Sequence, residues 1–127
     1  MIVGIGNDIV EIERVKKAAS RTSSFLDKLL TPLEKESVTK GNGFKMESIA
    51  GIFAAKEAVS KALGTGFVTF SLRDIEIFKD EKGKPNIKLY GGAEVIAKEM
   101  GVTQVHVSIS HSKSYATAIA IAEKREV

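Results

Sequence analysis

The chain has 127 residues and is predicted to form one domain over residues 1–127, because this length can bury roughly two-thirds of the surface of the unfolded chain. Apolar residues make up 43% and charged residues 28%, as in ordinary soluble globular proteins. With no cysteine and two histidines, the sequence excludes disulfides, thiolate catalysis and cysteine–zinc sites. Any metal should therefore have oxygen ligands, which favours Mg²⁺ or Mn²⁺.

The net charge of +3 is too small to indicate a nucleic-acid partner, but its distribution is uneven. Residues 14–28 hold five basic residues and one acidic residue, which gives a local charge of +4. This segment is either a solvated helix face or a docking surface for an acidic helical partner. No apolar run approaches a membrane span, and the glycine-interrupted first eight residues are too short for a signal peptide. We therefore expect no membrane partner and a reducing, cytoplasmic location.

The chain begins with a predicted strand over residues 2–9. Its alternation places Val3, Ile5 and Ile9 on one face and Asp8 on the other face, near the end of the strand. Asp8 either caps the helix that follows or is a functional carboxylate.

Three helical segments follow the first strand. Residues 11–20 predict an amphipathic helix whose outer face is basic. A second apolar segment contains Phe25 and Leu29 and ends at the Thr31-Pro32 break. Residues 33–38 predict a short helix, and residues 40–43 a loop.

A long helix is predicted from about residue 45 to residue 63, where Gly64 ends it. Glu57 and Lys61 are four residues apart and therefore share a face of this helix. They are either an ordinary surface pair or, because the helix is otherwise apolar, groups that bind a cation and a phosphate.

The second half of the chain is rich in predicted strands. Residues 74–78 and 86–90 predict a hairpin around a turn at 79–84, and a helix at 93–100 follows. Two last strands, residues 106–110 and 115–123, are joined by a polar turn. The order predicts an α+β fold in which antiparallel strands pack around one long central helix.

Few common catalytic motifs fit this sequence. Gly4-x-Gly6 lacks the third glycine of a dinucleotide-binding fingerprint, and neither a phosphate-binding P-loop nor a nucleophile elbow is present. What is left is two carboxylates, Asp8 and Glu57, with Lys61 one turn further on and His111 in the polar turn. Such a set suits Mg²⁺-assisted phosphoryl or phosphodiester chemistry, although a histidine at a hairpin tip, such as His111, is usually an ordinary exposed residue.

Three motifs in register resemble the signatures of the holo-[acyl-carrier-protein] synthase family, the short, trimeric type of 4′-phosphopantetheinyl transferase. They are G-I-G-N-D-I-V-E-I-E-R-V at residues 4–15, F-A-A-K-E-A-V-S-K-A-L-G-T-G at residues 53–66, and V-S-I-S-H-S at residues 107–112. The resemblance covers nearly the whole chain and implies the 4′-phosphopantetheinyl transferase fold.

The resemblance implies an enzyme of fatty acid biosynthesis. Its reaction transfers the 4′-phosphopantetheine arm of coenzyme A to a serine of apo acyl carrier protein and releases 3′,5′-ADP. The same resemblance makes Asp8, Glu57 and Lys61 the catalytic residues, with Asp8 and Glu57 as the ligands of Mg²⁺.

Binding residues are implied in the same way. The resemblance places Ser60, Lys61 and Gly64 beside coenzyme A, and brings His111 and Ser112 to its adenosine and 3′-phosphate from the neighbouring subunit of a homotrimer. It assigns a further set to the acyl carrier protein, namely Arg14, Arg21, Phe25 and Leu29.

Two rival functions belong to other classes. One is a non-catalytic module that binds an acidic helix through residues 14–28, with structural carboxylates. The other is a Mg²⁺-dependent nucleotide hydrolase.

Overall fold

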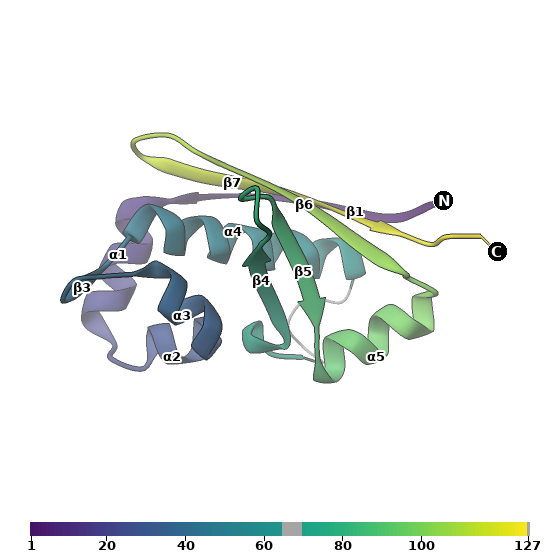
Figure 1. Cartoon of the computed structure of the whole chain (residues 1–127), viewed down its shortest axis with the longest axis horizontal. Helices are drawn as coiled ribbons and strands as arrows, with labels where there is room; N and C mark the ends of the chain where they lie inside the picture. The colour runs from purple at the N-terminus through teal and green to yellow at the C-terminus, as the bar shows by residue number, and fades with distance from the viewer. Residues whose placement is uncertain (65–69, 127) are drawn as a thin grey trace.

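The computed structural model describes residues 1–64 and 70–126, and its centre is the long helix α4 (Met46–Leu63). One face of α4 is covered by an antiparallel sheet with the strand order β1-β7-β6. These strands are β1 (Ile2–Glu11), β7 (Tyr115–Glu123) and β6 (Gln104–His111), and both chain ends lie at the same end of the sheet (Figure 1). The prediction of antiparallel strands around one long helix is confirmed.

Strand β1 is longer than predicted and continues through Glu11. Residue Asp8 pairs with Ala118 inside the strand, and Glu11 is the residue that precedes helix α1 (Ile12–Arg21). The interpretation of Asp8 as a helix cap is therefore wrong. Its side chain belongs to the face of the sheet that lies against α4, as the pairing of Gly6, Asp8 and Val10 with the buried alanines of β7 shows.

Two glycines allow β1 to lie directly against α4. A Cβ atom added at Gly4 would lie 2.0 Å from the carbonyl oxygen of Ala62, and one at Gly6 would lie 2.0 Å from that of Ala58. No real Cβ approaches an oxygen so closely, so both positions require glycine. The neighbouring strand β7 contributes only small side chains to the same face, at positions 116, 118, 120 and 122. The helix and the sheet are consequently in backbone contact at this point.

The apolar face of β1 points away from α4. Ile5 is 64% exposed and Ile9 is 63% exposed, and Ile119 and Tyr115 of β7 are exposed to a smaller extent. The alternation of the sequence predicted a strand, and glycines occupy the inner face of that strand. Its large apolar side chains therefore lie on the outside of the sheet.

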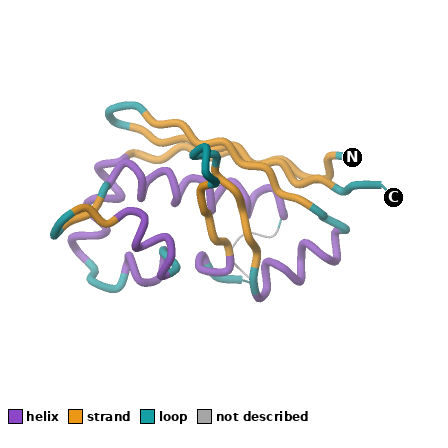
Figure 2. The backbone as a smooth tube through the Cα atoms, viewed as in Figure 1, coloured by secondary structure: helices purple, strands orange, loops and turns teal. Residues whose placement is uncertain are grey.

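The other elements cover the remaining sides of α4 (Figures 1 and 2). On the N-terminal side lie α1, α2 (Phe25–Leu29), α3 (Pro32–Val38) and the small hairpin of β2 (Thr39–Lys40) and β3 (Gly43–Phe44) in the expected loop. A 3₁₀ turn (Leu72–Asp74), the hairpin β4 (Ile75–Lys79) and β5 (Pro85–Leu89), and α5 (Gly91–Met100) complete the structure. Within residues 1–64 and 70–126, no helix has the length and apolar character needed to span a membrane.

Helix α4 ends where the sequence predicts. Gly64 is its C-cap and has a φ of 82°, in the left-handed region that glycine adopts readily, and its N–H donates to the carbonyls of Ser60 and Lys61. The last two residues of the helix motif, at positions 65 and 66, lie outside the described residues.

The Gly6→Ala substitution is expected to destabilise the protein severely, by about 3 kcal/mol or more, because its methyl group must displace the backbone of α4. Urea unfolding followed by circular dichroism measures the effect. The matched control is Gly43→Ala, where the nearest atom to an added Cβ is 3.9 Å away, and its free energy of unfolding should change by less than about 1 kcal/mol. Equal stability of the two variants would contradict the close contact of β1 and α4.

Candidate functional site

The contact of β1 with α4 brings Asp8 and Lys61 together. The Lys61 ammonium lies 3.2 Å from Oδ1 of Asp8 and donates to the carbonyl of Asn7 at 2.9 Å. The Asp8 side chain is 18% exposed and that of Lys61 is 52% exposed, so the pair lies at the surface with the carboxylate on the inner side. The ammonium is thus held by β1 and still accessible to a ligand.

The pKa of Glu57 is influenced by the charge of Asp8. Burial raises the pKa of the Glu57 carboxyl, the negative charge of Asp8 raises the pKa further, and Lys61 lowers it by less. Within the described residues, Lys61 makes its ion pair with Asp8 and not with Glu57, so the simple surface pair on α4 is not what the structure contains. Both charged groups of the Asp8–Lys61 ion pair therefore influence the pKa of Glu57.

These residues suit a hard divalent cation. Carboxylate oxygens are the ligands that Mg²⁺ prefers, and one or two of them are often enough because water and substrate phosphates complete the coordination. In the part of the chain that the structure describes, no group of three or more acidic or imidazole side chains converges on one point. Asp8 and Glu57 would thus be the only carboxylate ligands from this part of the chain, and an added cation would relieve their mutual repulsion.

A groove of about 390 Å³ opens beside this site. Apolar side chains line it together with one acidic side chain, Glu11, and one basic side chain, and they come from the end of β1, from α1, α2 and α4, and from the start of β7. Phe25 and Phe53 lie within it with ring centroids 6.3 Å apart, and the exposed Arg14 is at its edge. Phe53 was not predicted as a site residue, although it precedes Glu57 by one turn of α4.

The predicted binding residues differ in how accessible they are. Arg14 and Arg21 are exposed on α1, and Phe25 is half-buried in the groove. Leu29 is fully buried, so its side chain packs in the core and the prediction that it contacts a carrier protein is wrong. The Ser60 side chain is 2% exposed and donates to the carbonyl of Glu57, so its predicted contact with coenzyme A stays a prediction.

The structure does not bring His111 and Ser112 to the carboxylates within one chain. His111 ends β6, opposite Ala116 of β7, which in turn lies opposite Val10 of β1. Two strand spacings of about 4.8 Å therefore separate it from β1 across the sheet. Ser112 shapes the turn, since its hydroxyl accepts hydrogen bonds from the backbone N–H groups of Ser114 and Tyr115.

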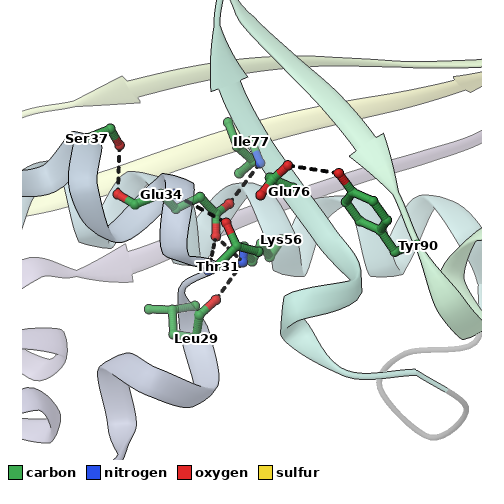
Figure 3. A network of polar contacts seen from close by, with 8 residues as sticks. All are labelled: Leu29, Thr31, Glu34, Ser37, Lys56, Glu76, Ile77 and Tyr90. Carbon is green, nitrogen blue, oxygen red and sulfur yellow. Dashed lines mark hydrogen bonds and ion pairs between the residues drawn. The ribbon is translucent and has the colours of Figure 1, made fainter.

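A buried ion pair next to the site was not predicted. Lys56 precedes Glu57 on α4, is completely buried, and lies 2.7 Å from Oε1 of the equally buried Glu34 (Figure 3). Burial lowers the pKa of Lys56, against the attraction of Glu34. The position of Lys56 in an alanine-rich helix could have indicated this ion pair, because a buried ammonium requires a partner.

Comparisons with known proteins identify the family of this chain. Residues 4–120 match the model of the 4′-phosphopantetheinyl transferase superfamily. A holo-[acyl-carrier-protein] synthase of Clostridium novyi (strain NT) is 53% identical over 123 residues, which are 97% of this chain and 88% of the relative.

Two solved structures are similar in fold. The crystal structure of holo-ACP-synthase from Plasmodium yoelii has a TM-score of 0.89 and 37% identity, and the match covers 99% of this chain and 98% of that one. The Helicobacter pylori holo-[acyl-carrier-protein] synthase in complex with coenzyme A has a TM-score of 0.83 and 36% identity, with 94% and 99% covered. This chain thus belongs to the 4′-phosphopantetheinyl transferase superfamily, among its holo-[acyl-carrier-protein] synthases.

Proposed function

We propose that this enzyme transfers 4′-phosphopantetheine from coenzyme A to a serine of apo acyl carrier protein, releases 3′,5′-ADP and serves fatty acid biosynthesis. The observation that carries the proposal is the ion pair of Asp8 with the half-exposed ammonium of Lys61, on the face of α4 that also carries Glu57 one turn earlier. Bound coenzyme A in the Helicobacter pylori relative supports the donor. A cytoplasmic location stays a prediction from the sequence.

The reaction exchanges one phosphorus–oxygen bond for another. The serine oxygen attacks the phosphorus that carries the pantetheine arm, the bond from that phosphorus to the bridging oxygen breaks, and 3′,5′-ADP departs with the electron pair. Mg²⁺ held by Asp8 and Glu57 would neutralise negative charge on the pyrophosphate. Lys61 can turn from Asp8 to the phosphate oxygens, since its side chain is 52% exposed. The serine proton passes to a carboxylate of the site or to a water molecule.

The Glu57→Gln substitution should lower the transfer rate roughly 10²–10³-fold, because transition-state charge loses part of its counter-charge. The measurement is the mass of apo carrier protein after incubation with coenzyme A and Mg²⁺, which rises by one phosphopantetheine with the wild-type enzyme. The matched control is Glu36→Gln, an exposed carboxylate on α3, with wild-type turnover. Coenzyme A hydrolysis without a gain in carrier mass would indicate a hydrolase, and no reaction with either substrate would indicate a binding module.

The same Glu57→Gln variant should be as stable as the wild type, or more stable, without a divalent metal at pH 8. Because the pKa of Glu57 is raised in the folded protein, the folded state binds its proton more tightly than the unfolded chain does. Stability therefore decreases as the pH rises from the ordinary carboxyl pKa through the raised one, and the neutral amide of the variant removes this decrease. Thermal unfolding at pH 4 and pH 8 measures it. A lower Tm of the variant at pH 8 would contradict the electrostatic description of the site.

We further propose that an acidic carrier protein docks along α1 and the groove. The basic segment of residues 14–28 supplies charge, and the Phe25–Phe53 pair supplies an apolar contact. The Arg14→Glu substitution should raise the KM for the carrier at least tenfold and leave the KM for coenzyme A unchanged. Association of the wild type should also weaken with salt as the Debye length falls below about 8–10 Å. The charge-matched control Lys98→Glu lies on α5, and equal effects of both reversals would exclude docking at α1.

A homotrimer is the third part of the proposal. It is supported by the outer face of the sheet, where Ile5 and Ile9 of β1 and Ile119 of β7 are exposed around Asn7, the residue that pairs with Ile119. Such a face is unusual on a monomer and typical of an interface. In a trimer assembled through this face, His111 and Ser112 of one subunit would reach the carboxylates of the neighbouring subunit.

The Ile5→Lys substitution should dissociate the trimer, because a buried ammonium in the interface would have no partner. Light scattering after gel filtration measures the mass of the particle. The control is Val95→Lys on α5, which is 55% exposed and lies away from the sheet, and it should keep the wild-type mass. A monomeric wild type, or a trimeric Ile5→Lys variant, would contradict assembly through this face.

A further inference from the structure

The buried pair of Lys56 and Glu34 joins four elements at one point. The Lys56 ammonium donates to Oε1 of Glu34 at 2.7 Å and to the carbonyl of Leu29, at the end of α2, at 2.5 Å. Oε1 of Glu34 also accepts from the N–H of Thr31 at 2.9 Å, at the start of α3. Oε2 accepts from the N–H of Ile77 in β4 at 2.8 Å (Figure 3). The Glu34 carboxylate of α3 thus connects to α4 and β4, and the Lys56 ammonium of α4 also connects to α2.

Stability alone is a poor reason for this arrangement. Both side chains are completely buried, and removing two charges from water costs about as much as their attraction returns. Apolar side chains of similar volume would often be as stable. What charges with fixed hydrogen-bond partners add is a defined orientation of the elements that carry them.

The orientation fixed here is that of Glu57. Successive residues of a helix point about 100° apart, so a fixed Lys56 side chain sets the rotation of α4 about its axis at the next residue. The residue after Glu57 is Ala58, and its carbonyl oxygen lies against Gly6 of β1. Glu57 therefore lies between two fixed points, with Lys56 tied to α2, α3 and β4 and Ala58 against β1.

We propose that Lys56 and Glu34 are positioning residues that hold the Glu57 carboxylate toward Asp8, and so set the affinity of the two-carboxylate site for a divalent cation. The inference rests on the proposed function, since it takes Asp8 and Glu57 as the cation ligands. Lys56 and Glu34 themselves touch no substrate, because both are enclosed in the core.

The test compares direct Mn²⁺ binding by the wild type and by the double variant Lys56→Met/Glu34→Gln, in the presence of coenzyme A. Electron paramagnetic resonance of free Mn²⁺ gives the dissociation constant without turnover. The double variant removes both charges; Gln keeps the length of Glu, and Met is one atom shorter than Lys. We expect a cooperative thermal transition, a dissociation constant at least tenfold higher, and a matching decrease in transfer rate. The control double variant Lys35→Met/Asp27→Asn removes an exposed pair between α2 and α3 and should bind Mn²⁺ as the wild type does.

A folded double variant with the wild-type Mn²⁺ affinity would overturn the inference alone. Equal Mn²⁺ affinities of the wild type and Glu57→Gln would instead overturn the metal site of the proposed function, and the inference with it. If the double variant does not fold, Glu34→Asp decides, because it keeps the paired charges but is too short to reach Thr31, Lys56 and Ile77 together. Weaker Mn²⁺ binding by folded Glu34→Asp supports the inference, and wild-type binding overturns it. Failure of both variants to fold would make the pair purely structural and also overturn it.

Discussion

The backbone contact between β1 and α4 is the constraint on which the site depends. Gly4 and Gly6 remove the side chains that would separate strand from helix, so that Asp8, two residues further along β1, lies against the turn of α4 that carries Lys61. Any larger residue at the two glycines would force the strand away from the helix, because its Cβ would lie 2.0 Å from a carbonyl oxygen of α4. Residues that are 53 positions apart in the chain are thereby brought to hydrogen-bond distance.

The site combines favourable and unfavourable interactions. Lys61 compensates Asp8, whereas Glu57 is partly buried next to a carboxylate of the same charge, and burial and repulsion both raise its pKa. Such an arrangement lowers the stability of the folded protein, as is common where function requires like charges together, and it supports the proposed cation site. The buried pair of Lys56 and Glu34 ties α4 to α2, α3 and β4 and makes this placement rigid.

Most of the fold could be predicted from the sequence, as could the candidate residues Asp8 and Lys61 that the structure brings together. Helix α4 was predictable because alanine-rich periodicity and Gly64 mark its course and end, and Asp8, Glu57 and Lys61 stood out by motif. Leu29 was misjudged because an amphipathic pattern shows that a side chain packs on something, without showing whether this is the core or a partner. Glu34 was missed because its partner Lys56 is 22 residues away, a separation that no local pattern encodes.

The most direct test of the account is the position of a bound cation in a crystal grown with Mn²⁺ and coenzyme A. Anomalous scattering locates manganese independently of the surrounding density. We predict one peak per subunit within coordination distance of carboxylate oxygens of both Asp8 and Glu57, with the Lys61 ammonium turned toward the phosphates. Manganese bound to neither carboxylate, or to one of them with the other turned away, would contradict a two-carboxylate site built by the contact of β1 with α4.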